Sequence, residues 1–427
     1  MTNIASGSEQ VLFRRKGEVV DYILKNVLAN KNRKIGTELE MFLIDQNGKA
    51  ITRDNGQKAF AEFKSIFALK GYESSFIYEQ DAQGTKTIFG LDVRNLGTIT
   101  PEIGHQFEFA CTVCQTTSEI QEKNDEFYSA IYEVAARLKH TPVFCGHIHG
   151  YVGSTEGSYR SRSVEWHNYF DKRFGNASMN VCESLDATAS TQVSIDSGSE
   201  KFHEFFQALL LIEPALTIHY ANSQRPHISV DRLPASHIKP IVGAWHTRSP
   251  REALNAIVDR LMQLEVPFLP DPEYPQIYRA EPLIGHCPPT VEDLMLQGRL
   301  NERTLNNVGG FLLSRPAIRR FSQGLLEMRG VDAQSTPEKV AEVARCVETI
   351  VYNDRIREEL LSDYAHLSAL DLLTMHRVSA MEDRDDALHT LVAGTRMIDF
   401  IDDILDRSQP EKSVPISLPS WENRAFA

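Results

Sequence analysis

The sequence predicts an α+β fold, with a mostly antiparallel sheet, helices beside it and a helical C-terminal subdomain. Segments that alternate polar and apolar residues recur between residues 35 and 329, as in strands that bury one face. A turn signal, Asp45-Gln-Asn-Gly48, favours a hairpin. From residue 337 to about residue 406, apolar residues follow helical spacing instead. We therefore expect one domain over residues 1–427, with its sheet in residues 30–330 and the helical subdomain in residues 331–410.

Further helices are expected before the C-terminal subdomain. Residues 10–30 show helical spacing, and Ser118 is the expected N-cap of a helix that runs to about residue 139. The same spacing recurs in residues 199–220 and 251–264, whereas residues 86–100, 101–111 and 142–152 have strand patterns. Residues 159–179 are polar, aromatic and rich in Arg, Asn and Gly, which favours a functional loop.

Composition limits the class of protein. Hydrophobic residues at 42% and charged residues at 24% are typical of globular proteins. The net charge of −13 argues against a broad nucleic-acid-binding surface, which needs clustered basic residues. No segment approaches the roughly 18 apolar residues of a membrane span, and the N-terminus lacks a basic segment followed by an apolar run. We expect a soluble, cytoplasmic protein that binds neither nucleic acid nor membrane.

Four short segments place polar residues on one strand face and apolar residues on the other. The polar positions are Glu38 and Glu40, Gln106 and Glu108, Gln192 and Ser194, and Glu327 and Arg329. If these strands lie side by side, several carboxylates gather around one arginine, and their repulsion favours bound cations. Carboxylate and amide oxygens without thiolates suit Mg²⁺ or Mn²⁺ better than zinc. For each pair taken alone, a solvated strand face remains the simpler alternative.

An arginine beside a metal-binding carboxylate fits phosphoryl chemistry, because its rigid fork matches phosphate oxygens. Glu327 and Arg329 have this spacing, although an ordinary cross-strand ion pair is the alternative. The sequence has no glycine-rich phosphate loop, so any ATP must be held through metals and side chains. Replacing Glu38 or Glu327 with glutamine is expected to abolish activity and leave the fold intact.

Two other motifs favour ordinary structural roles. His147 and His149 share one face of Gly146-His-Ile-His-Gly150 and could bind a transition metal, but no third ligand is evident. A substrate contact or plain surface is the alternative. Cys111 and Cys114 have CxxC spacing without a second pair, which favours buried, reduced thiols.

Six segments, in order, resemble the glutamate–cysteine ligase family, in the plant and proteobacterial branch that includes the ergothioneine-pathway ligases. They are Gly36-Thr-Glu-Leu-Glu40, Ile103-Gly-His-Gln-Phe-Glu-Phe109, Ser190-Thr-Gln-Val-Ser-Ile-Asp-Ser-Gly-Ser-Glu200, Tyr220-Ala-Asn-Ser223, Arg315-Pro-Ala-Ile-Arg319 and Leu325-Leu-Glu-Met-Arg-Gly330. The resemblance extends from about residue 30 to residue 410. It implies a curved antiparallel sheet, as in glutamine synthetase, whose concave face is the active site.

The resemblance also implies an activity: ATP-dependent joining of the γ-carboxylate of glutamate to the amine of cysteine or a related compound, through an acyl phosphate, as in glutathione biosynthesis. Carried over to this chain, the metal ligands for Mg²⁺ (or Mn²⁺) are Glu38, Glu40, Glu108 and Glu327. Glu327 and Arg329 are the expected catalytic residues, and Gln192, Ser194 and Arg329 are expected to contact ATP. The expected substrate contacts are Gln106, Thr191, Asn222, Arg232, Trp245 and Arg248.

Residues 224–248 depart from the family's Arg-Ser-x-Ile-Trp segment, and Arg232, Trp245 and Arg248 are the expected substitutes. This departure leaves open a ligase for a different amine or acid in a specialised metabolite pathway. A second alternative is no ligase at all, but a metal-binding pseudo-enzyme or a hydrolase that uses His147 and His149. The partners expected are small molecules, and the sequence leaves a homodimer open.

Overall fold

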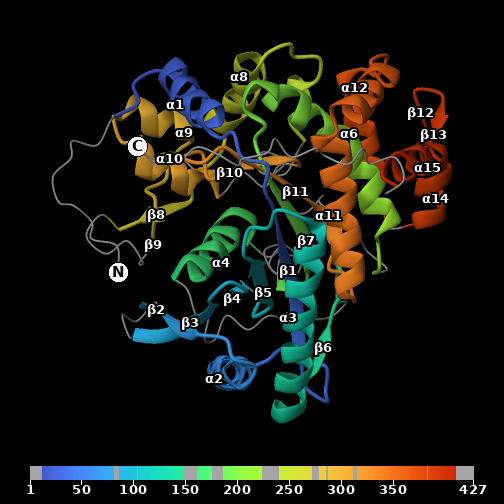
Figure 1. Cartoon of the computed structure of the whole chain (residues 1–427). Coiled ribbons are helices and arrows are strands. Elements are labelled where there is room, and N and C mark those ends of the chain that lie inside the picture. Colours follow the sequence, from blue (N-terminus) through green and yellow to red (C-terminus); the bar gives the residue numbers. More distant parts are fainter. Residues whose placement is uncertain are drawn as a thin grey trace, which may run out of the picture.

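The computed structural model describes residues 12–80, 86–102, 104–148, 161–175, 186–223, 240–271, 278–284, 287–310, 315–381 and 383–409. A nine-stranded sheet runs through the described residues, and each of its strand pairs is antiparallel (Figure 1). In sheet order its strands are β10 (Ala317–Arg319), β11 (Leu325–Asp332), β7 (Ser190–Asp196), β1 (Ile35–Ile44), β5 (Phe107–Cys111), β4 (Gly97–Pro101), β3 (Lys86–Val93) and β2 (Ser74–Gln80). The ninth strand, β6 (Thr141–Val143), pairs with the end of β1. The expected α+β fold with a mostly antiparallel sheet is confirmed.

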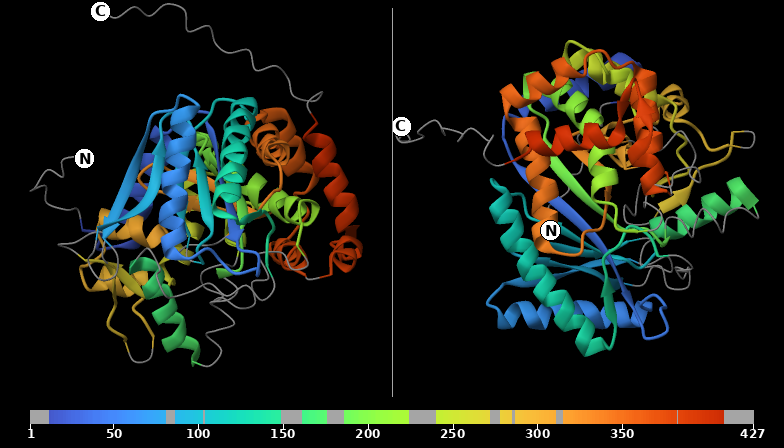
Figure 2. Two further views of the ribbon diagram at one scale, coloured as in Figure 1. Left: turned by 90° about the horizontal axis from the view of Figure 1, so that it is seen from below. Right: turned by 90° about the vertical axis from the view of Figure 1, so that its right-hand side faces the viewer.

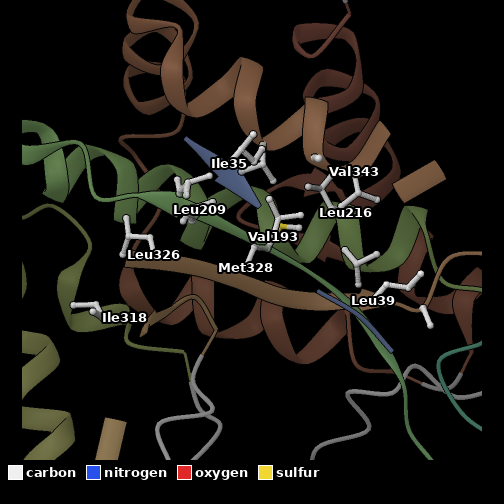
Figure 3. Close-up of a cluster of buried hydrophobic side chains, with 14 of the residues drawn as sticks. Ile35, Leu39, Val193, Leu209, Leu216, Ile318, Leu326, Met328 and Val343 are labelled. Atoms are coloured by element: carbon white, nitrogen blue, oxygen red, sulfur yellow. The ribbon is translucent and has the colours of Figure 1, made fainter. Parts of the chain in front are cut away.

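Three helices cover one face of this sheet: α3 (Thr117–Leu138), α6 (Phe202–His219) and α11 (Pro337–Tyr352). Figure 3 shows the interior between them, where Leu209 and Leu216 of α6 and Val343 of α11 face apolar strand residues. The labelled strand residues are Ile35, Leu39, Val193, Ile318, Leu326 and Met328, all at most 1% exposed. Burying such side chains contributes roughly 1.5–3 kcal/mol each. The apolar face of each strand therefore fixes which residues lie on the other face.

A second part of the core lies under the N-terminal half of the sheet. There α2 (Arg53–Leu69) packs beside α3, and Figure 2 shows the two helices side by side. Their aromatic rings stack: Phe109 of β5 lies 4.3 Å from Phe127 of α3, and Phe127 lies 6.1 Å from Phe63 of α2, centroid to centroid. These contacts anchor β5, and with it Glu108, from behind.

The remaining helices begin with α1 (Lys16–Ala29), α4 (Ser161–Phe174), α8 (Pro250–Met262), α9 (Val291–Leu296) and α10 (Glu302–Gly309). The C-terminal subdomain contains α11 and then α12 (Asp354–Asp363), α13 (Ala369–Val378), α14 (Arg384–His389) and α15 (Met397–Arg407), with a small hairpin of β12 (Leu391–Val392) and β13 (Thr395–Arg396) before α15. Short strands β8 (Phe268–Pro270) and β9 (Tyr278–Ala280) form a second hairpin. No helix in these described parts is long and apolar enough to cross a bilayer.

Some local expectations were wrong. The N-cap of α3 is Thr116, not Ser118: the Thr116 hydroxyl accepts a hydrogen bond from the amide of Glu119, 3.3 Å away. Within the segment expected as a loop, residues Ser161–Phe174 form α4, which buries Trp166 and Phe170 on one face. The strand expected over residues 86–100 is two strands, β3 and β4, joined by a turn at residues 94–96.

His376 joins the C-terminal subdomain to α6 and should make stability pH-dependent. Its Nε2–H donates to the carbonyl of Leu210, 2.8 Å away, and the side chain is 3% exposed. Burial, helped by the charge of Arg315, lowers the pKa of His376 from 6.5 to about 3. Because the unfolded chain binds the proton more tightly, the contribution of His376 lowers stability as pH drops below 6.5 toward 3 and is constant above 6.5.

Lowering the pH from 7 to 5 should therefore reduce the free energy of unfolding of the wild type by about 2 kcal/mol more than that of the His376→Gln variant. Glutamine keeps a side-chain N–H but does not titrate in this range. Urea unfolding followed by circular dichroism, at several pH values in that interval, measures the difference. Parallel curves for the two proteins would mean that folding does not lower the pKa of His376.

Candidate active site

The strand register brings the polar positions together on the sheet face opposite α3, α6 and α11. Glu38 of β1 pairs with Gln192 of β7, and Glu327 of β11 pairs with Ser194 of β7. On the other side of β1, Glu40 pairs with Glu108 of β5. Because β7 lies between β1 and β11, carboxylates from three strands share one face.

Glu327 is the buried anion between two arginines. Its Oε1 accepts a hydrogen bond from Nε of Arg319 at 2.8 Å and another from Nη1 of Arg329, and its Oε2 accepts one from the hydroxyl of Ser194 at 3.3 Å. Burial would raise the pKa of Glu327, but the two guanidinium groups outweigh it and lower that pKa. Arg329 remains charged, since Glu327, Glu38 and Glu40 together raise its pKa against the effect of burial. Glu327 is therefore ionised and held in place.

Glu40 is oriented by the neighbouring strand β7. Its Oε2 accepts hydrogen bonds from the amide and hydroxyl of Ser190 at 2.7 and 3.0 Å, and its Oε1 accepts one from Nε2 of Gln192 at 3.0 Å. Burial, with repulsion from Glu102, raises the pKa of Glu40 to about 7. Gln192 and Ser190 thus fix a carboxylate that is costly to ionise without a cation nearby.

Glu38 lies between the Glu327 group and Glu40. Burial raises its pKa to about 7, repulsion from Glu327 adds to the rise, and Arg319 and Arg329 oppose it. Within the described residues its carboxylate has no hydrogen-bond partner. Glu108 accepts a 3.4 Å hydrogen bond from Thr100 of β4. The site therefore contains a desolvated carboxylate whose charge the described protein groups balance only in part.

Such a set of ligands fits a hard divalent cation. The available oxygens come from carboxylates and amides, with no thiolate among them, which suits Mg²⁺ or Mn²⁺. As they stand, no three His, Cys, Asp or Glu residues in the described part of the chain converge tightly enough to hold a metal by themselves. This agrees with magnesium sites in nucleotide-using enzymes, where one or two carboxylates act together with substrate phosphates and water.

Two of the residues expected to contact substrate form hydrogen bonds to other parts of the chain. Thr191 has the same strand parity as Val193, lies on the helix-covered face and accepts a hydrogen bond from the amide of Gln334 at 3.1 Å. Asn222 ties separate segments together: its Oδ1 accepts from the amide of Gly146 at 3.0 Å, and its Nδ2 donates to the carbonyl of Ala333 at 2.5 Å. These contacts give both residues a structural part.

The other expected substrate contacts lie in different places. Gln106 is buried beside β5 and donates from Nε2 to the carbonyl of Thr188 at 2.6 Å. Trp245 is buried near α13, where its indole N–H donates to the carbonyl of Leu367 at 2.8 Å. Arg248 is exposed just before α8, and its amide donates to the side chain of Glu252. Trp245 and Arg248 therefore contact the helical part of the molecule rather than the carboxylate face. Arg232 lies outside the described residues.

Among the described residues, the histidine and cysteine motifs form no metal site. His147 forms a β-bridge with Thr188, and His149 lies outside the described residues. Cys111 and Cys114 are free buried thiols 3.7 Å apart, sulfur to sulfur, and Lys123 donates to Cys114 at 3.3 Å. No zinc-like group forms around them among the described residues.

Sequence reasoning did not single out Arg319, Ser190 or Glu102 as site residues. Arg319 and Ser190 lie in segments already used for the family resemblance, so the signal was present. Their roles became visible only with the cross-strand contacts to Glu327 and Glu40.

Residues 34–223 match the family model "Glutamate-cysteine ligase family 2 (GCS2)". Among solved structures, the chain is similar to the ligase PafA in its complex with the prokaryotic ubiquitin-like protein Pup, at 12% identity and a TM-score of 0.34; the match covers 90% of this chain and 58% of that one. It is also similar to ligand-free GmaS, at 12% identity and a TM-score of 0.32, with 96% and 76% covered. The chain thus spans less than two thirds of PafA.

A comparison with curated proteins finds no matching sequence. The family match includes β1, β5 and β7, which carry Glu38, Glu40, Glu108 and Gln192. It supports a carboxylate–amine ligase. The resemblance to the glutamate–cysteine ligase family is thereby confirmed, over residues 34–223.

Proposed function

We propose that this protein is an ATP-dependent ligase that joins the γ-carboxylate of glutamate to the amine of cysteine or a related amino compound. The observation that carries the proposal is the sheet face on which Glu38, Glu40 and the Glu327–Arg329 pair lie together. With cysteine as the amine, the reaction would belong to glutathione biosynthesis. The family match supports the ligase class, and the choice of substrates is the proposal.

Each residue has a distinct part in the proposed reaction. Glu38, Glu40, Glu108 and Glu327 would hold a divalent cation, which would supply charge neutralisation to the phosphates. Arg329 would present its fork to the phosphoryl group in transfer, while Glu327, itself bound by Arg319, holds the guanidinium of Arg329 in place. Ser194 and Gln192 border the same face and would contact the nucleotide.

The proposed bond changes are those that the family resemblance implies. An oxygen of the substrate γ-carboxylate attacks the terminal phosphorus of ATP, the bond to ADP breaks, and an acyl phosphate forms. The amine nitrogen then attacks the acyl carbon, inorganic phosphate leaves, and the nitrogen loses a proton as the amide forms. Because the phosphoryl step needs positioning and charge neutralisation more than covalent help, two arginines and carboxylates that would hold a divalent cation are suitable groups for it.

Phosphate release from ATP, measured over a panel of amino acids and amines with Mg²⁺, tests the proposal. We expect turnover that requires both glutamate and cysteine, with amide product identified by mass spectrometry. Reactions lacking either amino acid are the matched controls. Turnover with glutamate and a different amine would support the ligase class but show that cysteine is not the second substrate. That result would fit a specialised metabolite pathway.

Absence of amino-acid-dependent ATP consumption, together with zinc in the protein as isolated, would favour the non-ligase alternative based on His147 and His149. That alternative lacks geometric support in the described residues, which contain no cluster of three metal-binding side chains.

A further inference from the structure

Helix α6 carries a fully buried carboxylate, Glu213, among mostly apolar helix residues. Glu213 is 0% exposed and lies between Ile212 and Pro214, on the helix that packs against β11. Burial raises the pKa of Glu213 to about 7, and Arg315 is the main group that opposes the rise. A buried carboxylate is costly compared with an apolar side chain of similar size, so its contacts are informative.

Glu213 binds the backbone of β11 where its pairing is irregular. The register with β7 shifts between Met328 and Val331, so Arg329 and Gly330 lie in a bulge. The amide of Arg329 donates to Oε1 of Glu213 at 2.9 Å. A Cβ at Gly330 would lie 2.9 Å from Cγ of Glu213, so glycine permits this close approach of strand and helix. Glu213 therefore fixes the bulge from the rear of the sheet.

The bulge determines where the Arg329 side chain emerges. On the opposite face of the sheet its guanidinium donates to Glu327, the carboxylate of the candidate site. A bulge re-aims a side chain because an extra residue bends the strand at that point. The contact from Glu213 to the Arg329 amide is thus a support behind the residue assigned to phosphoryl transfer.

Arg315 extends this support beyond the helix. It is 5% exposed, lies two residues before β10, and interacts electrostatically with both Glu213 and Arg329. Burial lowers the pKa of Arg315 to about 10, and the attraction of Glu213 works against that decrease. A buried cation next to Glu213 favours an ionised carboxylate, which accepts the Arg329 amide more strongly.

We propose that Glu213 is a positioning residue for Arg329: by binding the bulge at Arg329 it sets the guanidinium on the catalytic face. This inference rests on the proposed function for its effect on turnover. An apolar residue at position 213 would avoid the cost of burying a carboxylate. Positioning of Arg329 explains why a carboxylate is present there.

Two variants of Glu213 distinguish the effect of its side-chain length from the effect of its charge. Glu213→Asp keeps the charge beside Arg315 but shortens the side chain by one methylene, so it withdraws the oxygen from the Arg329 amide. Glu213→Gln loses the charge but keeps an oxygen at the same reach. The matched control is Gln207→Asn, which shortens another buried α6 side chain, one that donates from Nε2 to Thr247.

Two measurements are made on each full-length protein. Hydrogen exchange followed by mass spectrometry reports protection of the Arg329 and Gly330 amides and does not depend on activity. Steady-state kinetics then gives kcat and KM for ATP, and a double-mutant cycle combines Glu213→Asp with Arg329→Lys.

We expect Glu213→Asp to speed exchange at Arg329 and to lower kcat about 100-fold, as for a misplaced catalytic group, with little change in KM. Glu213→Gln and Gln207→Asn should both stay within about fivefold of the wild-type kcat. In the Arg329→Lys background, Glu213→Asp should lower kcat less than about twofold further, because its effect passes through Arg329.

Normal exchange at Arg329 in Glu213→Asp would overturn the proposal, as would a full additional loss in the Arg329→Lys background. Faster exchange with an unchanged kcat would overturn it too. If the wild type shows no amino-acid-dependent ATP consumption, the proposed function fails separately, and the exchange data alone decide whether Glu213 holds Arg329.

Discussion

Replacing Glu38 with glutamine is expected to abolish ligation and, without Mg²⁺, to make the protein more stable at pH 8. Glu38 is desolvated and repelled by Glu327, so its ionised form is costly when no cation is bound. Glutamine removes that cost together with a metal-binding oxygen. We expect turnover to fall about 10³-fold, the range for losing a charge-stabilising group. Mg²⁺ should raise the melting temperature of the wild type but not of the variant.

Mg²⁺-dependent ATP turnover and thermal unfolding with and without Mg²⁺ measure this result. Asp92→Asn is the matched control, because Asp92 is an exposed carboxylate on β3 of the same sheet. It should change neither quantity. Wild-type turnover and an unchanged Mg²⁺ response in Glu38→Gln would remove Glu38 from the metal site.

Glu327→Gln should behave differently from Glu38→Gln, although the sequence suggested that both would leave the fold intact. Glu327 neutralises Arg319 and Arg329, so its replacement leaves two largely buried cations without their anion. Removing one partner of a buried ion pair costs about 3–5 kcal/mol. Glu327→Gln should therefore lose stability as well as activity, which makes Glu38→Gln the cleaner test of metal binding.

The alternation of polar and apolar residues made the main part of the site predictable. A strand that packs against helices must bury every second residue, so Glu38 and Glu40 had to share the face away from Leu39 and Met41. The same rule could have excluded Thr191, because that residue has the parity of the buried Val193. Where the expectation for Thr191 departed from this pattern, it followed the family resemblance instead.

Contacts between distant segments could not be predicted from local patterns. Strand β10 has only three residues, so nothing local showed that Arg319 would reach Glu327. Glu213 is the buried carboxylate of a mostly apolar helix whose other carboxylate, Glu204, lies in the first turn. Its partner at Arg329 lies 116 residues away in the chain. The helix α4 is a different case: its buried Trp166 and Phe170 are four residues apart, a helical signal obscured by polar neighbours.

Replacing Arg329 with lysine should be as damaging as the loss of a metal ligand, even though the charge is kept. Arg329 donates to Glu327 on a face where Glu38 and Glu40 also attract its positive charge. A lysine at this position would therefore stay charged and leave the fold intact. Lysine has no planar fork, however, and cannot bind Glu327 and a phosphoryl oxygen with fixed geometry at the same time. We expect kcat to fall about 10³-fold or more, as when an arginine is withdrawn from phosphoryl transfer.

Arg299→Lys is the matched control for that experiment. Arg299 forms a two-pronged ion pair with Glu281, at 2.7 and 2.8 Å, and among the described residues neither of the two contacts Glu327. It tests the cost of losing a guanidinium fork as such, and should leave kcat unchanged. Steady-state kinetics on both variants, with unfolding curves to compare stability, separates the two roles. If Arg329→Lys turned over at nearly the wild-type rate, the guanidinium would only balance the charge of Glu327, and phosphoryl transfer would need another cation.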